Sequence, residues 1–385
     1  MAPQLVLATV IVALLAGAIY AQGAPAQSSP TYISAIQVDP TRPNVVFAGT
    51  IDHGVLKSTD GGRTWGAANR GLPRSPWPPP ASGIRVDALV IDPRSPNVLY
   101  AGTGLGVFKT SDGARTWRLA GTGIDYDDDS RKYRLAEGSI WGMAIDPIHT
   151  STVYAAGRGG AWKTTTGGAT WKRVLRNRVL NLAVDPRRPN TVYANGMSFY
   201  KTVDGGGRWR QSEPPGLHDN FFGHPIVVDR YRPGMIYAGG SRGLFASSNQ
   251  GRTWSTVLPL PRASSGVNAI ALDPSRANVL YVGTFTRGIV KSVDAGQTWS
   301  TLHLGGHGCG VSAIAIARTR PQTIYAGVYG ERPAAGGMFV SIDGGARGAA
   351  SSDKATRHCP QNLPRQSALW HAVTRLRDCM PLLGQ

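Results

Sequence analysis

The chain has 385 residues, with 49 glycines and 27 prolines distributed among apolar residues that make up 41% of the sequence. This composition excludes a disordered or collagen-like chain and is typical of an all-β protein with many turns. The formal net charge is +18, but no long run of adjacent basic residues occurs, so we expect no nucleic acid partner. Three cysteines (Cys309, Cys359 and Cys379) are too few for a disulfide framework, and their spacing predicts no metal site.

The N-terminal segment is apolar. Leu5–Tyr20 carries no charge, and small residues follow it up to Ala26. This pattern predicts a secretory signal peptide over residues 1–26, and hence a secreted or periplasmic protein. An uncleaved membrane anchor is the alternative, although the apolar run is short for a membrane span.

Seven copies of a repeat follow, from Ile33 to Gly345. Each copy contains a turn motif such as VIDPRSPNVLYAG, in which an aspartate precedes an aromatic residue by eight positions. The pairs in the first six copies are Asp39 and Phe47, Asp92 and Tyr100, Asp146 and Tyr154, Asp185 and Tyr193, Asp229 and Tyr237, and Asp273 and Tyr281. The seventh copy keeps the spacing, from Ala317 to Tyr325, but has lost the aspartate.

A second motif, such as STDGGRTW, lies downstream in each copy. Its third residue is an aspartate in five copies: Asp60, Asp112, Asp204, Asp294 and Asp343. Five positions later, six copies have a tryptophan: Trp65, Trp117, Trp171, Trp209, Trp254 and Trp299. Thr166 and Asn249 replace the aspartate in copies three and five, and we expect looser turns there because neither side chain carries a charge.

Each repeat predicts one blade of a β-propeller. Short runs of β-branched and aromatic residues between turn residues predict strands. In the second motif the aspartate can accept backbone N–H bonds within a turn, while glycine supplies a positive φ. Four short antiparallel strands per repeat are the content of one blade. We therefore expect an all-β fold, a single seven-bladed propeller over residues 33–345 with six complete blades and a truncated seventh.

These motifs resemble the Asp-box (BNR) repeats, S-x-D-x-G-x-T-W, of bacterial sialidases, sortilin-type domains, xyloglucan-cleaving glycosidases and photosystem assembly factors. The resemblance covers residues 33–345 and implies the propeller fold rather than one function. We interpret the box aspartates and tryptophans as structural residues. We expect the protein to be a monomer that needs no cofactor.

The connections between strands vary in length on one face only. The two constant turns lie on one face of each blade, and the connection of strands two and three lies on the opposite face with the blade-to-blade link. Insertions on one face of a repeat array typically mark its working surface. Candidate ligand-binding residues there are Asp52, Trp77, Arg158, Arg242, Arg287 and Glu331.

The three arginines could bind a carboxylate or sulfate, and Trp77 could stack on a sugar ring or cover the propeller. Bacterial sialidases use an arginine trio of this kind, but this sequence lacks their Arg-Ile-Pro tripeptide and an identifiable Tyr–Glu pair. We interpret the acidic loop DYDDD at Asp125 as a solvated loop, and His218 and His224 as structural, rather than as metal ligands.

The repeat pattern stops after Gly345. Residues 346–385 have no repeat signal, and we expect a divergent, poorly ordered tail that is either native or the product of a reading-frame change. Leu369–Leu376 could form one or two amphipathic turns. The segment Pro30–Ser34 is too short to pair with the last blade, so the closure of the ring is left open.

Three function classes fit the sequence. The favoured one is an exported, non-catalytic propeller that binds an acidic glycan or a protein through its variable face. The second is a glycoside hydrolase, which needs two carboxylates flanking a cleft; the candidates are Asp52, Asp127, Asp219 and Glu331. The third is an assembly factor for a membrane protein complex, suggested by the resemblance and the basic charge.

Overall fold

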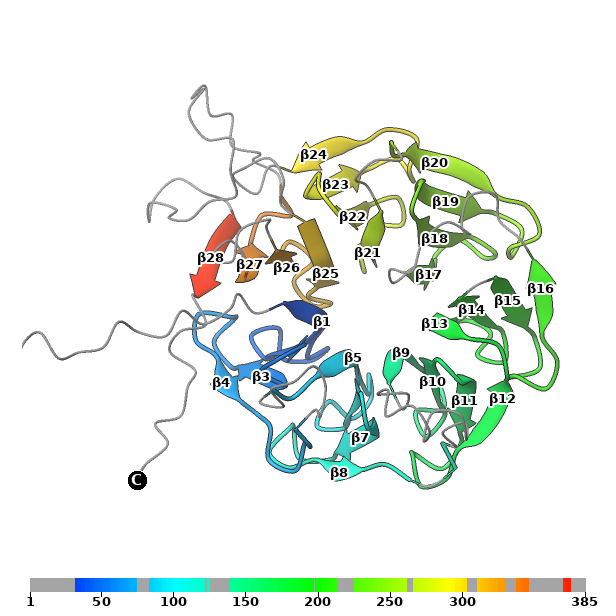
Figure 1. The fold of residues 1–385 in the computed structure, drawn as a ribbon. Coiled ribbons are helices and arrows are strands. Elements are labelled where there is room, and N and C mark those ends of the chain that lie inside the picture. The colour runs from blue at the N-terminus through cyan, green and yellow to red at the C-terminus, as the bar shows by residue number, and fades with distance from the viewer. Residues whose placement is uncertain are drawn as a thin grey trace, which may run out of the picture.

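The protein is a seven-bladed, all-β propeller. The computed structural model describes residues 32–74, 83–121, 123–124, 139–196, 198–212, 225–261, 266–302, 310–329, 337–345 and 370–374. Seven four-stranded antiparallel sheets lie in a ring around a central axis (Figure 1), which confirms the predicted fold class. Within these ranges there is no helix long and apolar enough to cross a membrane.

Every blade uses the same strand order from the axis outwards. The innermost strands are β1 (Ile33–Val38), β5 (Val86–Ile91), β9 (Ile140–Ile145), β13 (Val179–Val184), β17 (Ile226–Val228), β21 (Val267–Leu272) and β25 (Gly310–Ile316). The second strands are β2 (Val46–Thr50), β6 (Leu99–Thr103), β10 (Val153–Gly157), β14 (Val192–Gly196), β18 (Ile236–Gly240), β22 (Leu280–Thr284) and β26 (Ile324–Tyr329).

The third strands are largely buried, whereas the outermost strands of the first six blades are more exposed. The third strands are β3 (Val55–Ser58), β7 (Gly106–Thr110), β11 (Gly160–Thr164), β15 (Phe199–Thr202), β19 (Gly243–Ser247), β23 (Ile289–Ser292) and β27 (Gly337–Ser341). The outermost strands are β4 (Gly66–Ala67), β8 (Arg118–Leu119), β12 (Lys172–Leu175), β16 (Arg210–Ser212), β20 (Ser255–Pro259), β24 (Ser300–Leu302) and β28 (Trp370–Thr374).

The seventh blade corrects the prediction of a truncated blade. Its fourth strand is β28, which pairs antiparallel with β27 from Ser341 opposite Trp370 to Met338 opposite Thr374. This strand lies well beyond Gly345, in the segment for which we expected turns and no strand. An outermost strand needs only backbone pairing to one neighbour, so it requires none of the repeat motif.

The ring closes by packing between the first and last blades. Strand β1 lies beside β25 and β26 (Figure 1). The Ser312 hydroxyl donates to the Ile33 carbonyl at 2.6 Å, and the Tyr325 hydroxyl donates to the Pro43 carbonyl at 3.3 Å. Among the described residues, the seventh blade consists of β25 to β28 and contains no N-terminal strand.

The repeated aromatic residues hold neighbouring blades together. The second-strand residue of each repeat, Phe47 or one of six tyrosines, is at most 1% exposed. Tyr100 of the second blade packs with Trp171 of the third, and Tyr325 of the seventh packs with Trp65 of the first. Burial of each of these aromatic side chains stabilises the packing of adjacent blades by on the order of 2 kcal/mol, which explains the fixed spacing of the aromatic residue in the repeat.

The turns between third and fourth strands share one hydrogen-bond pattern. In the first blade the Ser58 hydroxyl accepts the Gly62 N–H at 2.8 Å, and Asp60 accepts the Thr64 N–H at 2.9 Å and its hydroxyl at 2.6 Å. In the third blade the Thr166 hydroxyl accepts the Thr170 N–H at 3.0 Å. We expected the replacement of aspartate by Thr166 to loosen this turn. The neutral hydroxyl nevertheless keeps the hydrogen bond to the backbone.

These turns predict a loss of stability in acid. Burial raises the pKa of Asp60, but hydrogen bonds from Thr64 and Ser58 outweigh it and lower the pKa to about 2. Hydrogen bonds from Thr298 and Ser292 likewise lower the pKa of Asp294 to about 2. Because a folded-state pKa below the unfolded value stabilises the fold above that value, we expect Tm to fall as the pH drops from about 4 to about 2. Thermal melts across this range check it; a constant Tm would contradict it.

Candidate functional site

The two faces of the propeller differ in what they carry. One face, here called the turn face, carries the turns between strands one and two and between strands three and four. The opposite loop face carries the connections between strands two and three and the links from blade to blade. The loop face is where the length of the connections varies, which makes it the candidate location of a binding site.

A β-bulge lies near the loop-face end of six innermost strands. In each case one residue of the innermost strand has no partner in the register with the second strand. The bulged residues, here called the bulge ring, are Ser34, Asp87, Trp141, Leu180, Asn268 and Ser312. Bulges commonly re-aim a side chain at the rim of a β-structure or beside a binding site.

Asp87 is the charged member of the bulge ring. Arg85 donates to it from Nε at 2.9 and 3.0 Å and forms an ion pair from Nη2 at 2.8 Å. Burial raises the pKa of Asp87 although Arg85 opposes this shift. Tyr32 interacts electrostatically with both residues, and burial raises its pKa too. The first two blades therefore join a phenol, a guanidinium and a carboxyl at one point of the loop face.

An arc of aromatic rings continues from Tyr32 towards the sixth blade. The ring centroids of Tyr32 and Tyr329 are 5.2 Å apart, and those of Tyr329 and Phe285 are 5.8 Å apart at 68°. Asn268 of the bulge ring donates to the Tyr329 hydroxyl at 2.9 Å and to the Val311 carbonyl at 3.2 Å. We call Tyr32, Tyr329 and Phe285 the aromatic arc.

A glycine makes this arrangement of rings feasible. A Cβ placed on Gly310 would overlap the ring of Tyr329, so only glycine lets that ring lie against the start of β25. Phe285 remains 41% exposed at the end of the arc. Asn268 and Gly310 thus fix the position of Tyr329 within the aromatic arc, and Phe285 at the end of the arc is exposed to solvent.

The structure places four of the predicted site residues. Asp52 and His53 form an ion pair of 2.8 Å in the β2–β3 connection, and this partner raises the pKa of His53. Arg158, Arg242 and Arg287 lie in the β10–β11, β18–β19 and β22–β23 connections of the loop face; Arg158 and Arg287 are exposed and Arg242 is half-buried. Trp77, Glu331, Asp125, Asp127, His218, Asp219 and His224 lie outside the described residues.

Sequence reasoning missed the bulge ring and the aromatic arc. The sequence does contain a signal for the bulge ring. Every bulged residue precedes the turn aspartate, or Ala317 in the seventh copy, by five positions. Aligning the copies one strand further upstream would have shown Asp87 and Asn268 among otherwise apolar or small residues. No group of three or more potential metal ligands occurs among the described residues.

Comparison with known proteins shows likeness to other propellers. No protein-family profile matches the chain. It is 31% identical over 97 residues, 24% of its length, to an oligoxyloglucan-reducing end-specific xyloglucanase of Emericella nidulans. It is 28% identical over 149 residues, 36% of its length, to a probable enzyme of the same name from Neosartorya fischeri. The matched segments span only 11% and 17% of those two proteins.

Solved structures agree on the fold. The GH74 xyloglucanase from Xanthomonas campestris superposes with a TM-score of 0.61 at 18% identity, covering 82% of this chain and 52% of the enzyme. YCF48 from Cyanidioschyzon merolae superposes with a TM-score of 0.57 at 14% identity, covering 83% of this chain and 98% of that protein. At these identities the likeness establishes the β-propeller fold.

Proposed function

We propose that the protein is an exported, non-catalytic propeller that binds an oligosaccharide across the aromatic arc of its loop face. The observation that carries the proposal is the supported, partly exposed row of Tyr32, Tyr329 and Phe285 beside the Arg85–Asp87 pair. Aromatic faces pack against the C–H face of a sugar, while guanidinium, carboxylate and amide groups bind its hydroxyls.

The comparisons support the ligand class, and the N-terminal sequence supports export. Two relatives that match part of the chain are named for cleaving oligoxyloglucan, so we take xyloglucan oligosaccharides as the first ligands to test. Export is the expectation from the apolar segment in residues 1–26, which lies outside the described residues.

We also assign the turns around Asp60, Asp112 and Asp294 to the Asp-box class because they share the motif and the hydrogen-bond pattern.

Replacing Phe285 by alanine is expected to weaken oligosaccharide binding about five- to tenfold, because one stacked ring contributes about 1–1.5 kcal/mol and also supports Tyr329. Isothermal titration with xyloglucan oligosaccharides measures the loss. Leu105→Ala is the matched control, since Leu105 is 39% exposed and lies in the β6–β7 connection of the same face. Equal affinities for the wild type and both variants would refute a site at the arc.

Glycoside hydrolysis is the second candidate function, and the specific observation behind it is Asp87. A buried carboxyl with a raised pKa is suited to act as a general acid. Asp52 is the other carboxylate described on this face, and it is paired with His53. It would have to break this ion pair to act as the second carboxylate of a hydrolase. Release of reducing sugar that disappears in Asp87→Asn would support the hydrolase and count against the binding module.

A further inference from the structure

The turn between the first two strands holds a buried carboxylate in six blades. In the sixth blade Asp273 accepts the N–H groups of Ser275 at 2.8 Å and Arg276 at 3.0 Å. The Arg276 guanidinium donates to its other oxygen at 2.9 and 2.6 Å. The same aspartate–arginine arrangement recurs in three further blades, at Asp39 and Arg42, Asp185 and Arg188, and Asp229 and Arg232. Each is a preformed receptor for one carboxylate.

The seventh blade keeps the turn and its arginine but lacks the carboxylate. Ala317 replaces the aspartate, and the turn keeps its backbone bonds from Ala317 N–H to Thr323 and from Arg320 N–H to the Ala317 carbonyl. Arg320 occupies the place of Arg276 and is exposed. Its hydrogen bond runs from Nη1 to Asn44 at 3.4 Å, and it forms no ion pair with any residue that the structure describes.

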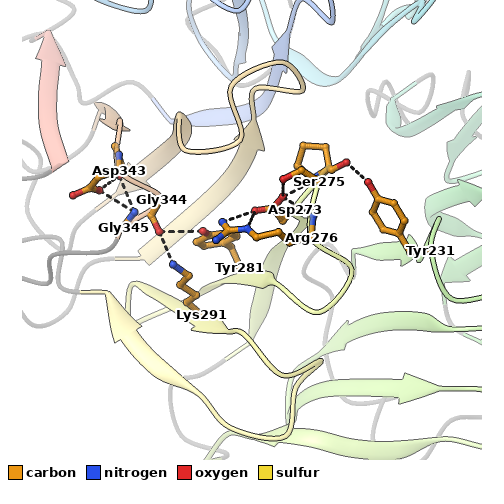
Figure 2. Close-up of polar contacts among 11 residues, drawn as sticks. Tyr231, Asp273, Ser275, Arg276, Tyr281, Lys291, Asp343, Gly344 and Gly345 are labelled. Carbon is orange, nitrogen blue, oxygen red and sulfur yellow. Dashed lines mark hydrogen bonds and ion pairs between the residues drawn. The ribbon is translucent and has the colours of Figure 1, made fainter.

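This arginine lines a groove on the turn face between the sixth and seventh blades. The groove has a volume of about 690 Å³ and is bordered by Ser275, Arg276, Ile342 and the turn from Thr319 to Thr323. Ile342 is 68% exposed. Figure 2 shows polar contacts beside the groove, where Asp273 holds Arg276 and where Tyr281 and Lys291 donate to the Gly344 carbonyl.

We propose that this groove binds an acidic peptide segment of a partner protein, with a carboxylate of the peptide pairing with the exposed guanidinium of Arg320, which has no aspartate of its own turn to pair with because Ala317 stands in that position. Charge favours this ligand because Arg276 is already neutralised by Asp273 whereas Arg320 is not. A groove of this volume holds several side chains, so a single small anion would fill little of it. Ile342 offers an apolar contact to a residue flanking the acidic one.

The site is independent of the proposed oligosaccharide site, which lies on the opposite face. Two substitutions test it from opposite directions. Arg320→Gln removes the cation, and Ala317→Asp supplies an internal carboxylate that competes with the peptide. Arg318→Gln is the matched control, because Arg318 is an exposed arginine of the same turn that does not line the groove.

Fluorescence anisotropy on the full chain measures binding of a labelled hexapeptide that carries two aspartates and a leucine. We expect it to bind at least tenfold more tightly than its asparagine analogue, and Arg320→Gln and Ala317→Asp each to lower its affinity about tenfold. Arg318→Gln should bind as the wild type does. Equal binding of the two peptides, wild-type affinity in both test variants, or an equal loss in Arg318→Gln would overturn the proposal. Unchanged oligosaccharide binding in these variants separates its failure from that of the loop-face site.

Discussion

Substitution of Asp273 by alanine is expected to lower the free energy of unfolding by about 2–3 kcal/mol. The carboxylate has no exposed surface, and five hydrogen bonds from Ser275 and Arg276 end on it. Its removal leaves the backbone N–H groups of Ser275 and Arg276 without their side-chain acceptor and Arg276 without its counter-charge (Figure 2). The midpoint of urea unfolding, at an unchanged slope, measures the loss.

The seventh blade supplies the opposite experiment for the same prediction. Ala317→Asp restores the missing carboxylate beside Arg320 and is expected to raise the unfolding free energy by about 1 kcal/mol. Arg276→Ala is a milder control than Asp273→Ala, because the Arg276 side chain is 50% exposed. A loss in Asp273→Ala no larger than that in Arg276→Ala would show that the buried carboxylate is not what stabilises the turn.

Truncation after Gly345 is expected to lower Tm by about 10 °C or more and to promote aggregation. The cut removes β28, the strand that pairs with β27 through Met338, Phe339, Val340 and Ser341. Strand β27 is buried along its whole length and would become an unpaired edge of the last blade. An edge of apolar residues with free N–H and C=O groups is a template for pairing with other chains.

The matched control for this truncation is a chain that ends after Arg375. It keeps β28 and is expected to melt as the full chain does, because the pairing of β27 is intact. Differential scanning fluorimetry and light scattering on the two truncated proteins separate the contribution of β28 from that of residues 376–385. A full-chain Tm for the protein that ends at Gly345 would contradict the assignment of β28 to the seventh blade.

The fold was predictable because its determinants repeat. The eight-residue spacing from Asp92 to Tyr100 joins a buried turn aspartate to a buried aromatic side chain, and six of the seven blades have both. Strand β28 was not predictable because an outermost strand is specified by pairing and by little else. Asn249 kept its turn for a reason that the sequence does not display: its side-chain oxygen accepts the Thr253 N–H at 2.9 Å, as an aspartate would.

The candidate site was harder to predict than the fold. The three arginines were chosen because they lie in loops, and the structure does place them on the loop face. The aromatic arc depends instead on contacts between distant segments, since Tyr32 meets Tyr329 only when the ring closes. A bulge that aims Asn268 at Tyr329 leaves no mark in the alternation of apolar residues, although the fixed distance to the turn would have located it.

The most direct measurement of the central claim is a calorimetric titration of the full chain with xyloglucan oligosaccharides, run beside an assay for reducing sugar. Our account predicts saturable binding that depends on Phe285 and no release of reducing ends. Turnover that depends on Asp87 would contradict it and favour the hydrolase. A titration without saturable binding, or with binding unchanged in Phe285→Ala, would contradict it as well.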